Sequence, residues 1–189
     1  MFSPEADLFF QQPSTPPSIP GTFGILYLLR RDALQCLGID PNTGAENGSP
    51  ALWPGTMTVL AGIDLLAKFL AGDDKPGGVG WRFQEFVSRF FQPIDQGDEA
   101  AIYQLRNALL HSFGLYSETK SEKFRFTVGC GGARLVTRID KERLSVDIAT
   151  LHEKFEHSVV EYQCDLGGCS QLQRNFRNMF PKYGFTNIG

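Results

Sequence analysis

The sequence predicts a mainly α-helical protein: an up-and-down four-helix bundle, followed by a small antiparallel β-appendage and C-terminal helices. Two observations lead to this prediction. Apolar residues recur at helical spacing in four segments between residues 23 and 117, and the period then shortens to two between residues 123 and 148. With 42% hydrophobic and 21% charged residues, the 189-residue chain has enough apolar material for one ordinary core.

Residues 1–22 are predicted to form a flexible, extended N-terminal arm. Prolines occur in this segment among Ser, Thr and Gln, a composition that does not favour a packed element. Two adjacent aromatic residues, Phe9 and Phe10, are the exception, because they would be able to dock the arm onto the body of the protein or onto a partner.

The bundle is predicted over residues 23–120. Its helices are expected at 23–37, 56–70 and 81–91, and from Gly97-Asp98 to about Tyr116. The second of them is apolar on nearly all sides, as expected for the central helix of a bundle. Asp64 and Lys68 interrupt its apolar run, so we do not expect it to span a membrane.

Residues 121–189 are predicted to add a β-hairpin appendage and C-terminal helices, packed on the bundle as one unit with it. Short antiparallel strands are expected where apolar residues alternate, at 124–128, 135–139 and 144–148. A capping-box pattern at Thr150 to Glu153 then predicts a helix. A last helix, 172–180, is expected to dock through its aromatic face, although its interleaved arginines also suit contact with RNA.

Charge and cysteine content limit the class of protein. A net charge of −3 and a pI near 5.6 argue against a protein that coats nucleic acid by bulk electrostatics. The N-terminus has no basic region followed by a long apolar run, so no secretory signal is predicted. The four cysteines are irregularly spaced, as is typical of reduced thiols, and we therefore expect a cytoplasmic protein.

The fourth bundle helix carries a separate polar arc, formed by Arg106, Asn107 and His111 together with Tyr103. At about 100° per residue, these side chains lie within about 140° of one another. The apolar stripe of the same helix lies on the other side and is predicted to face the core: Ile102, Leu105, Leu109 and Phe113.

This combination of side chains suits the cleavage of RNA without a metal ion. Histidine transfers protons near neutral pH, and arginine offsets the charge of the phosphoryl transition state. Asn107 would orient the imidazole or hold a phosphate oxygen. One helix supplies only one histidine, so two copies facing each other in a homodimer would be needed to supply both acid and base.

The segment Arg106-Asn107-Ala108-Leu109-Leu110-His111 resembles the Arg-polar-x-x-x-His motif of the HEPN superfamily, which lies near the end of the last long bundle helix. The resemblance implies a metal-independent endoribonuclease with a composite dimer cleft, without a cofactor, and with Arg106, His111 and Asn107 as site residues. It further implies RNA as substrate, and a toxin–antitoxin or phage-defence role with a cognate antitoxin as partner.

Two other functions remain open at this point. Some HEPN proteins have lost activity and serve as dimerisation or nucleotide- and RNA-binding modules, which the acidic balance of this chain also suits. Alternatively, the protein is a structural accessory protein whose β-appendage forms the functional surface.

One histidine pattern and one cysteine pattern resemble metal sites in part. His152 and His157 are five residues apart and would point about 140° away from each other, whereas a zinc-protease helix needs a spacing of four. Cys164 and Cys169 have a spacing found in some zinc knuckles, but a second pair is missing. We therefore expect free thiols and no metal.

Overall fold

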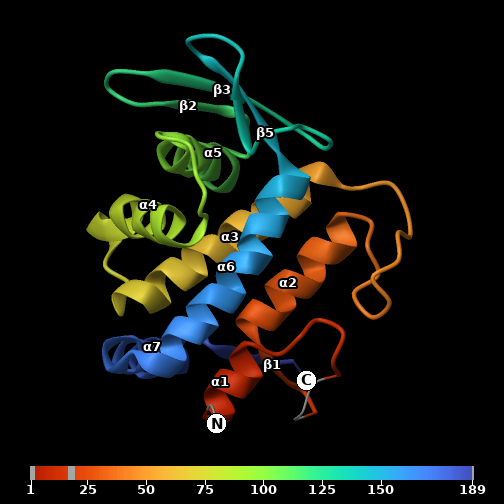
Figure 1. Cartoon of the computed structure of the whole chain (residues 1–189), viewed down its shortest axis with the longest axis vertical. Helices are drawn as coiled ribbons and strands as arrows, with labels where there is room; N and C mark the ends of the chain where they lie inside the picture. The colour runs from red at the N-terminus through yellow and green to blue at the C-terminus, as the bar shows by residue number, and fades with distance from the viewer. Residues whose placement is uncertain (1–2, 17–19, 189) are drawn as a thin grey trace.

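The computed structural model describes residues 3–16 and 20–188 and is mostly helical, as predicted (Figure 1). The four helices predicted for the bundle correspond to α2 to α5. The helices are α1 (Pro4–Phe9), α2 (Ile25–Cys36), α3 (Leu52–Ala71), α4 (Val79–Phe90), α5 (Asp98–Ser112), α6 (Ile148–Gly168) and α7 (Ser170–Tyr183), with a short 3-10 helix at Pro76–Gly78.

Helix α3 is the central helix of the core. It packs against α2, α4, α5, α6 and α7. By length and composition α3 would be able to cross a membrane, but 56% of its apolar window is buried inside the protein. Most of its apolar surface is therefore buried against the neighbouring helices.

Helix α6 also belongs to this core and packs against α3 and α4. Leu151, Phe155 and Tyr162 of α6 are fully buried. Gly62 on α3 permits the close approach of α6, because a β-carbon at this position would overlap the ring of Phe155. One continuous set of buried apolar residues extends from Ala6 to Phe180.

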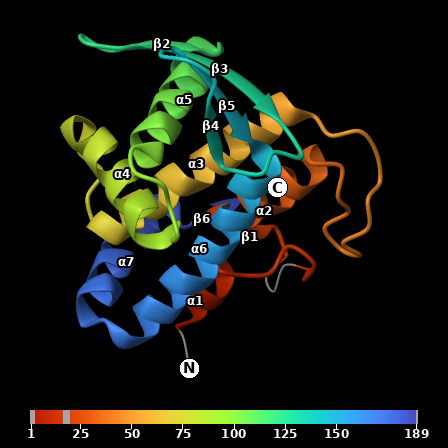
Figure 2. The same ribbon diagram turned by 45° about the horizontal axis from the view of Figure 1, so that its top comes forward.

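The β-appendage is a four-stranded sheet that covers one end of the helical core (Figures 1 and 2). Its strands are β2 (Tyr116–Glu118), β3 (Lys123–Gly129), β4 (Val136–Arg138) and β5 (Arg143–Asp147), in the order β2-β3-β5-β4. The predicted alternation is present in β3, where Phe124 and Phe126 are buried and their neighbours are exposed.

The prediction of a purely antiparallel sheet was wrong, because β3 and β5 pair in parallel, with Phe126 opposite Leu144. After β3 the chain forms the edge strand β4, and β5 then lies between β3 and β4. Strand β4 pairs antiparallel with β5. The two-residue period gives each strand one apolar face but contains no information about its direction.

The N-terminal segment is not the extended arm that its prolines predicted. Pro4 occupies the first turn of α1, where its missing N–H costs no hydrogen bond, and the hydroxyl of Ser3 accepts from the N–H of Ala6 at 3.3 Å. Phe9 is fully buried and Phe10 is 4% exposed, so these two rings dock the segment onto the body. Residues 1–2 and 17–19 of the predicted arm lie outside the described residues.

A two-stranded sheet joins segments near the two ends of the chain. Strand β1 (Thr22–Gly24) pairs antiparallel with β6 (Phe185–Asn187). Helix α7 docks through its aromatic face, as predicted, with Phe176 and Phe180 buried and the ring of Phe176 5.4 Å from that of Phe9.

Candidate functional site

The polar motif lies in the last two turns of α5, with Arg106 directed at the central helix rather than at solvent. Ile102, Leu105 and Leu109 are fully buried and hold α5 against the core. Arg106 is only 7% exposed. The helical wheel placed Arg106 off the apolar stripe, but it did not show that another helix covers this side of α5.

A carboxylate on α3 anchors Arg106. Nη2 of Arg106 donates to Oδ2 of Asp64 at 3.0 Å, and the two side chains are 9% and 15% exposed. Nζ of Lys68 lies 3.9 Å from the same Asp64 oxygen, so two cations share one carboxylate. Because burial strengthens charge–charge interactions, this pair joins α3 and α5 more firmly than a surface ion pair would.

His111 lies in direct contact with the guanidinium group. Nη1 of Arg106 is 2.6 Å from Nε2 of His111, and the same Nη1 donates to Oδ1 of Asn107 at 3.2 Å. A guanidinium group only donates hydrogen bonds, so Nε2 must be the acceptor and the neutral ring carries its proton on Nδ1. His111 itself is exposed. The three predicted site residues are therefore brought together.

The motif combines a buried guanidinium group with an exposed imidazole. The cation lies beneath the surface between Asp64 and the imidazole, and the imidazole faces solvent. Nε of Arg106 is buried and has no hydrogen-bond partner among the described residues. Both Nη atoms are engaged and Nε is buried, so an anion arriving at this site would contact the imidazole first, with the guanidinium charge behind it partly offset by Asp64.

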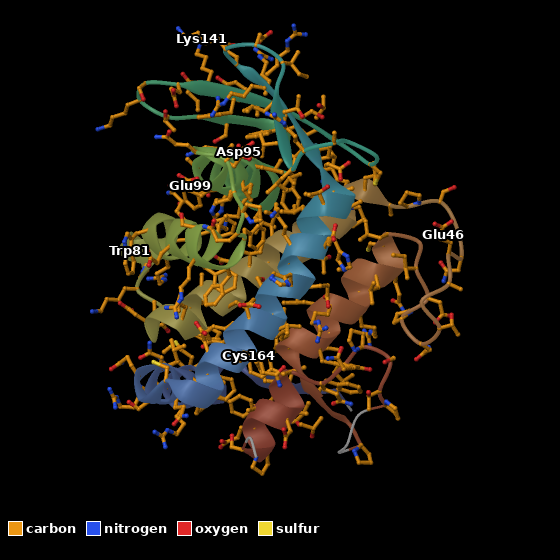
Figure 3. All side chains as sticks on the ribbon, in the orientation of Figure 1. Glu46, Trp81, Asp95, Glu99, Lys141 and Cys164 are labelled. Carbon is orange, nitrogen blue, oxygen red and sulfur yellow. The ribbon has the colours of Figure 1, made fainter. Side chains whose placement is uncertain are left out.

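Tyr103 does not join the motif. Its ring packs 5.6 Å from that of Phe83, and Gly80 of α4 lies against the same ring. Glu99 belongs to the first turn of α5, the opposite end of the helix from His111 (Figure 3). In that turn, burial and the neighbouring Asp95 raise the pKa of Asp98 to about 6.

The predicted burial of Phe113 was wrong. Helix α5 ends at Ser112, and Phe113 takes the left-handed conformation with φ 47°. Its side chain is 72% exposed. The reversal of the backbone removes Phe113 from the apolar stripe that the helical period assigned to it, and β2 begins at Tyr116, where the helix was expected to end.

The remaining histidine and cysteine patterns do not form a metal centre in residues 3–16 and 20–188, where no group of three or more His, Cys, Asp and Glu side chains is suitably placed. His152 is largely buried and His157 is exposed beside Glu161. Cys164 and Cys169, like the other two cysteines, are free thiols.

Asp64 belongs to the site although its sequence position did not predict it. It is 42 residues from Arg106 along the chain, and it was considered only as an interruption of an apolar run. A carboxylate in the middle of a helix that is apolar on nearly all sides was nevertheless a signal. Such a group is costly to bury unless it has a partner.

Comparison of the chain with models of known protein families, with curated proteins and with solved structures gave no match.

Proposed function

We propose that this protein is a metal-independent endoribonuclease of the HEPN type. The single observation that carries the proposal is the contact between the buried Arg106 guanidinium and the exposed His111 imidazole, 2.6 Å apart, with Asp64 behind them. A polar motif that was only a pattern along one helix corresponds to a set of side chains in contact.

Each residue has a defined role in the proposed reaction. His111 transfers a proton at the attacking 2′-hydroxyl or the leaving 5′-oxygen. Arg106 offsets the charge that develops on the phosphoryl oxygens. Asn107 shares Nη1 of Arg106 with the imidazole and so helps to hold the guanidinium plane. Asp64 positions Arg106 from α3 without touching the RNA.

The reaction needs both an acid and a base, whereas one chain supplies one histidine in this motif. The proposed active form is therefore a homodimer in which two copies of α5 face a shared cleft. In that form the two His111 side chains divide the acid and base roles. A cytoplasmic toxin or defence component, with a cognate antitoxin, is the biological setting that the HEPN resemblance suggests.

The test is cleavage of a structured RNA by the purified protein in EDTA. His111→Ala and Arg106→Ala should each lower the rate by about a hundred-fold or more. Tyr103→Phe is the matched control, since Tyr103 lies on α5 but outside the motif. Equal rates for all variants, or loss of cleavage in EDTA, would contradict the proposal.

One observation favours a second candidate, a catalytically silent HEPN-like module for dimerisation or RNA binding. Asp64 neutralises the charge of Arg106, and the chain carries a net charge of −3. For a silent module, the purified protein would not cleave RNA, and expression would not arrest growth. Growth arrest that is relieved by His111→Ala would exclude this candidate.

A further inference from the structure

Phe113 combines two unfavourable properties at the end of the motif helix. Among the described residues it is the one non-glycine residue with a positive φ, at 47°. Its ring is also 72% exposed, more than the exposed Trp81, at 66%. Left-handed positions usually hold glycine, so a bulky residue there costs free energy, and the exposed ring of Phe113 gains little from burial to offset that cost.

The helix end itself does not require phenylalanine. The N–H groups of Phe113 and Gly114 both donate to the carbonyl of Ala108, a backbone arrangement that needs no particular side chain. Glycine would adopt the left-handed conformation at Phe113 without steric cost. A strained residue that the fold does not require is an indication of function.

The residues that are close to Phe113 in sequence favour a nucleic-acid base as the group that covers the ring. Phe113 follows the exposed His111 by two residues. Tyr116, three residues further on, is 39% exposed, and the guanidinium of Arg125 lies 5.3 Å from the centre of its ring. Exposed aromatic rings interleaved with cations are the usual means of holding single-stranded RNA.

We propose that Phe113 is a stacking residue for an unpaired base of the RNA, next to the scissile phosphate at Arg106 and His111. This inference rests on the proposed function and adds to it that the substrate is single-stranded at the cleavage site. The left-handed backbone turns the ring out of the core and presents its face to the RNA.

The experiment measures binding of a short fluorescent single-stranded 2′-O-methyl RNA, which has no 2′-hydroxyl to react. Phe113→Leu, which remains apolar but lacks a ring, and Phe113→Gly should each bind on the order of ten-fold more weakly than the wild type, whereas Phe113→Trp should bind at least as tightly. Trp81→Leu is the matched control, because it removes an exposed ring from the outer side of α4 (Figure 3).

A second readout separates stacking from a structural role. Phe113→Gly should raise Tm by roughly 2–4 °C, because glycine removes the steric strain of the left-handed backbone. The same variant should bind RNA more weakly. A structural residue would instead lose stability and binding together, and that result would overturn the inference. Unchanged binding by Phe113→Leu would also overturn it, as would a loss of the dimer that accounts for the weaker binding.

The two proposals fail in different ways. If the wild type cleaves RNA and Phe113→Leu binds and cleaves equally well, the stacking role is wrong and the proposed nuclease stands. If the wild type neither binds nor cleaves RNA, both are wrong.

Discussion

Two buried arginines in this protein have similar carboxylate partners but differ in how fully their guanidinium nitrogens are hydrogen-bonded. Arg30 on α2 and Arg106 on α5 are 3% and 7% exposed, and each pairs with a carboxylate on another helix. Nε of Arg30 donates to both oxygens of Glu156 at 3.0 and 3.1 Å, and Nη2 donates to Oε2 at 2.6 Å. Nη1 and Nη2 also reach oxygens of Gln11 and Gln12.

The histidines near the two arginines differ in their exposure to solvent. His152, near Glu156, is 12% exposed, and burial lowers its pKa. His111 is exposed and contacts Arg106 directly. All three guanidinium nitrogens of Arg30 have hydrogen-bond partners, and these bonds connect α2 with α6 and with the N-terminal segment. Nε of Arg106, by contrast, is buried without a hydrogen-bond partner in residues 3–16 and 20–188, and Nη1 is shared with an exposed imidazole.

The largest expected effect comes from replacing each arginine with lysine, which retains the charge but lacks the planar fork. Arg106→Lys should lower kcat for RNA cleavage about a hundred-fold. Arg30→Lys should leave kcat unchanged and lower the free energy of unfolding by about 1–3 kcal/mol, since several hydrogen bonds are lost. Steady-state kinetics and urea denaturation measure the two quantities. A matching loss of kcat in both variants would remove the contrast.

Replacing the carboxylate partners of the two arginines should produce a smaller difference, which is measured in the free energy of unfolding. Glu156→Gln leaves the Arg30 charge buried without compensation and should lower the free energy of unfolding by about 3 kcal/mol. Asp64→Asn should cost about 1–2 kcal/mol, because Asp64 accepts one hydrogen bond from Arg106 whereas Glu156 accepts three from Arg30. Urea denaturation of both variants checks this order. An equal cost would mean that Arg106 is as structural as Arg30.

The smallest expected effect is a dependence of stability on pH that His152 causes. Burial is the main cause of its lowered pKa, the Arg30 charge adds to it, and Glu156 opposes it. The unfolded chain binds a proton on His152 below about pH 6.5, whereas the folded protein resists it, so stability falls as pH falls through this range.

Replacing the histidine should remove this part of the pH dependence. The difference in Tm between His152→Gln and the wild type should become more positive from about pH 7 to about pH 5, while that of His157→Gln, on an exposed part of the same helix, should not change. Thermal unfolding across that range decides between them, and equal slopes for His152→Gln and the wild type would contradict the assignment.

The sequence by itself determined the local elements and the position of the motif. Helical and two-residue periods located α2 to α5 and the strands after Ser117, because a segment with one apolar face has few ways to bury it. The same periods placed Arg106, Asn107 and His111 on one arc. These properties depend on residues close together in the chain, and they follow from backbone geometry alone.

Only the tertiary structure decided which groups meet. The pairing of Arg106 with Asp64, the parallel pairing of β3 with β5, the docking of Phe9 and the entry of α6 into the core all join segments far apart in sequence. One-dimensional periodicity shows that a face is apolar but not what covers it. Phe113 is the clearest case, since the helical period predicted its burial and the end of the helix turned it toward solvent.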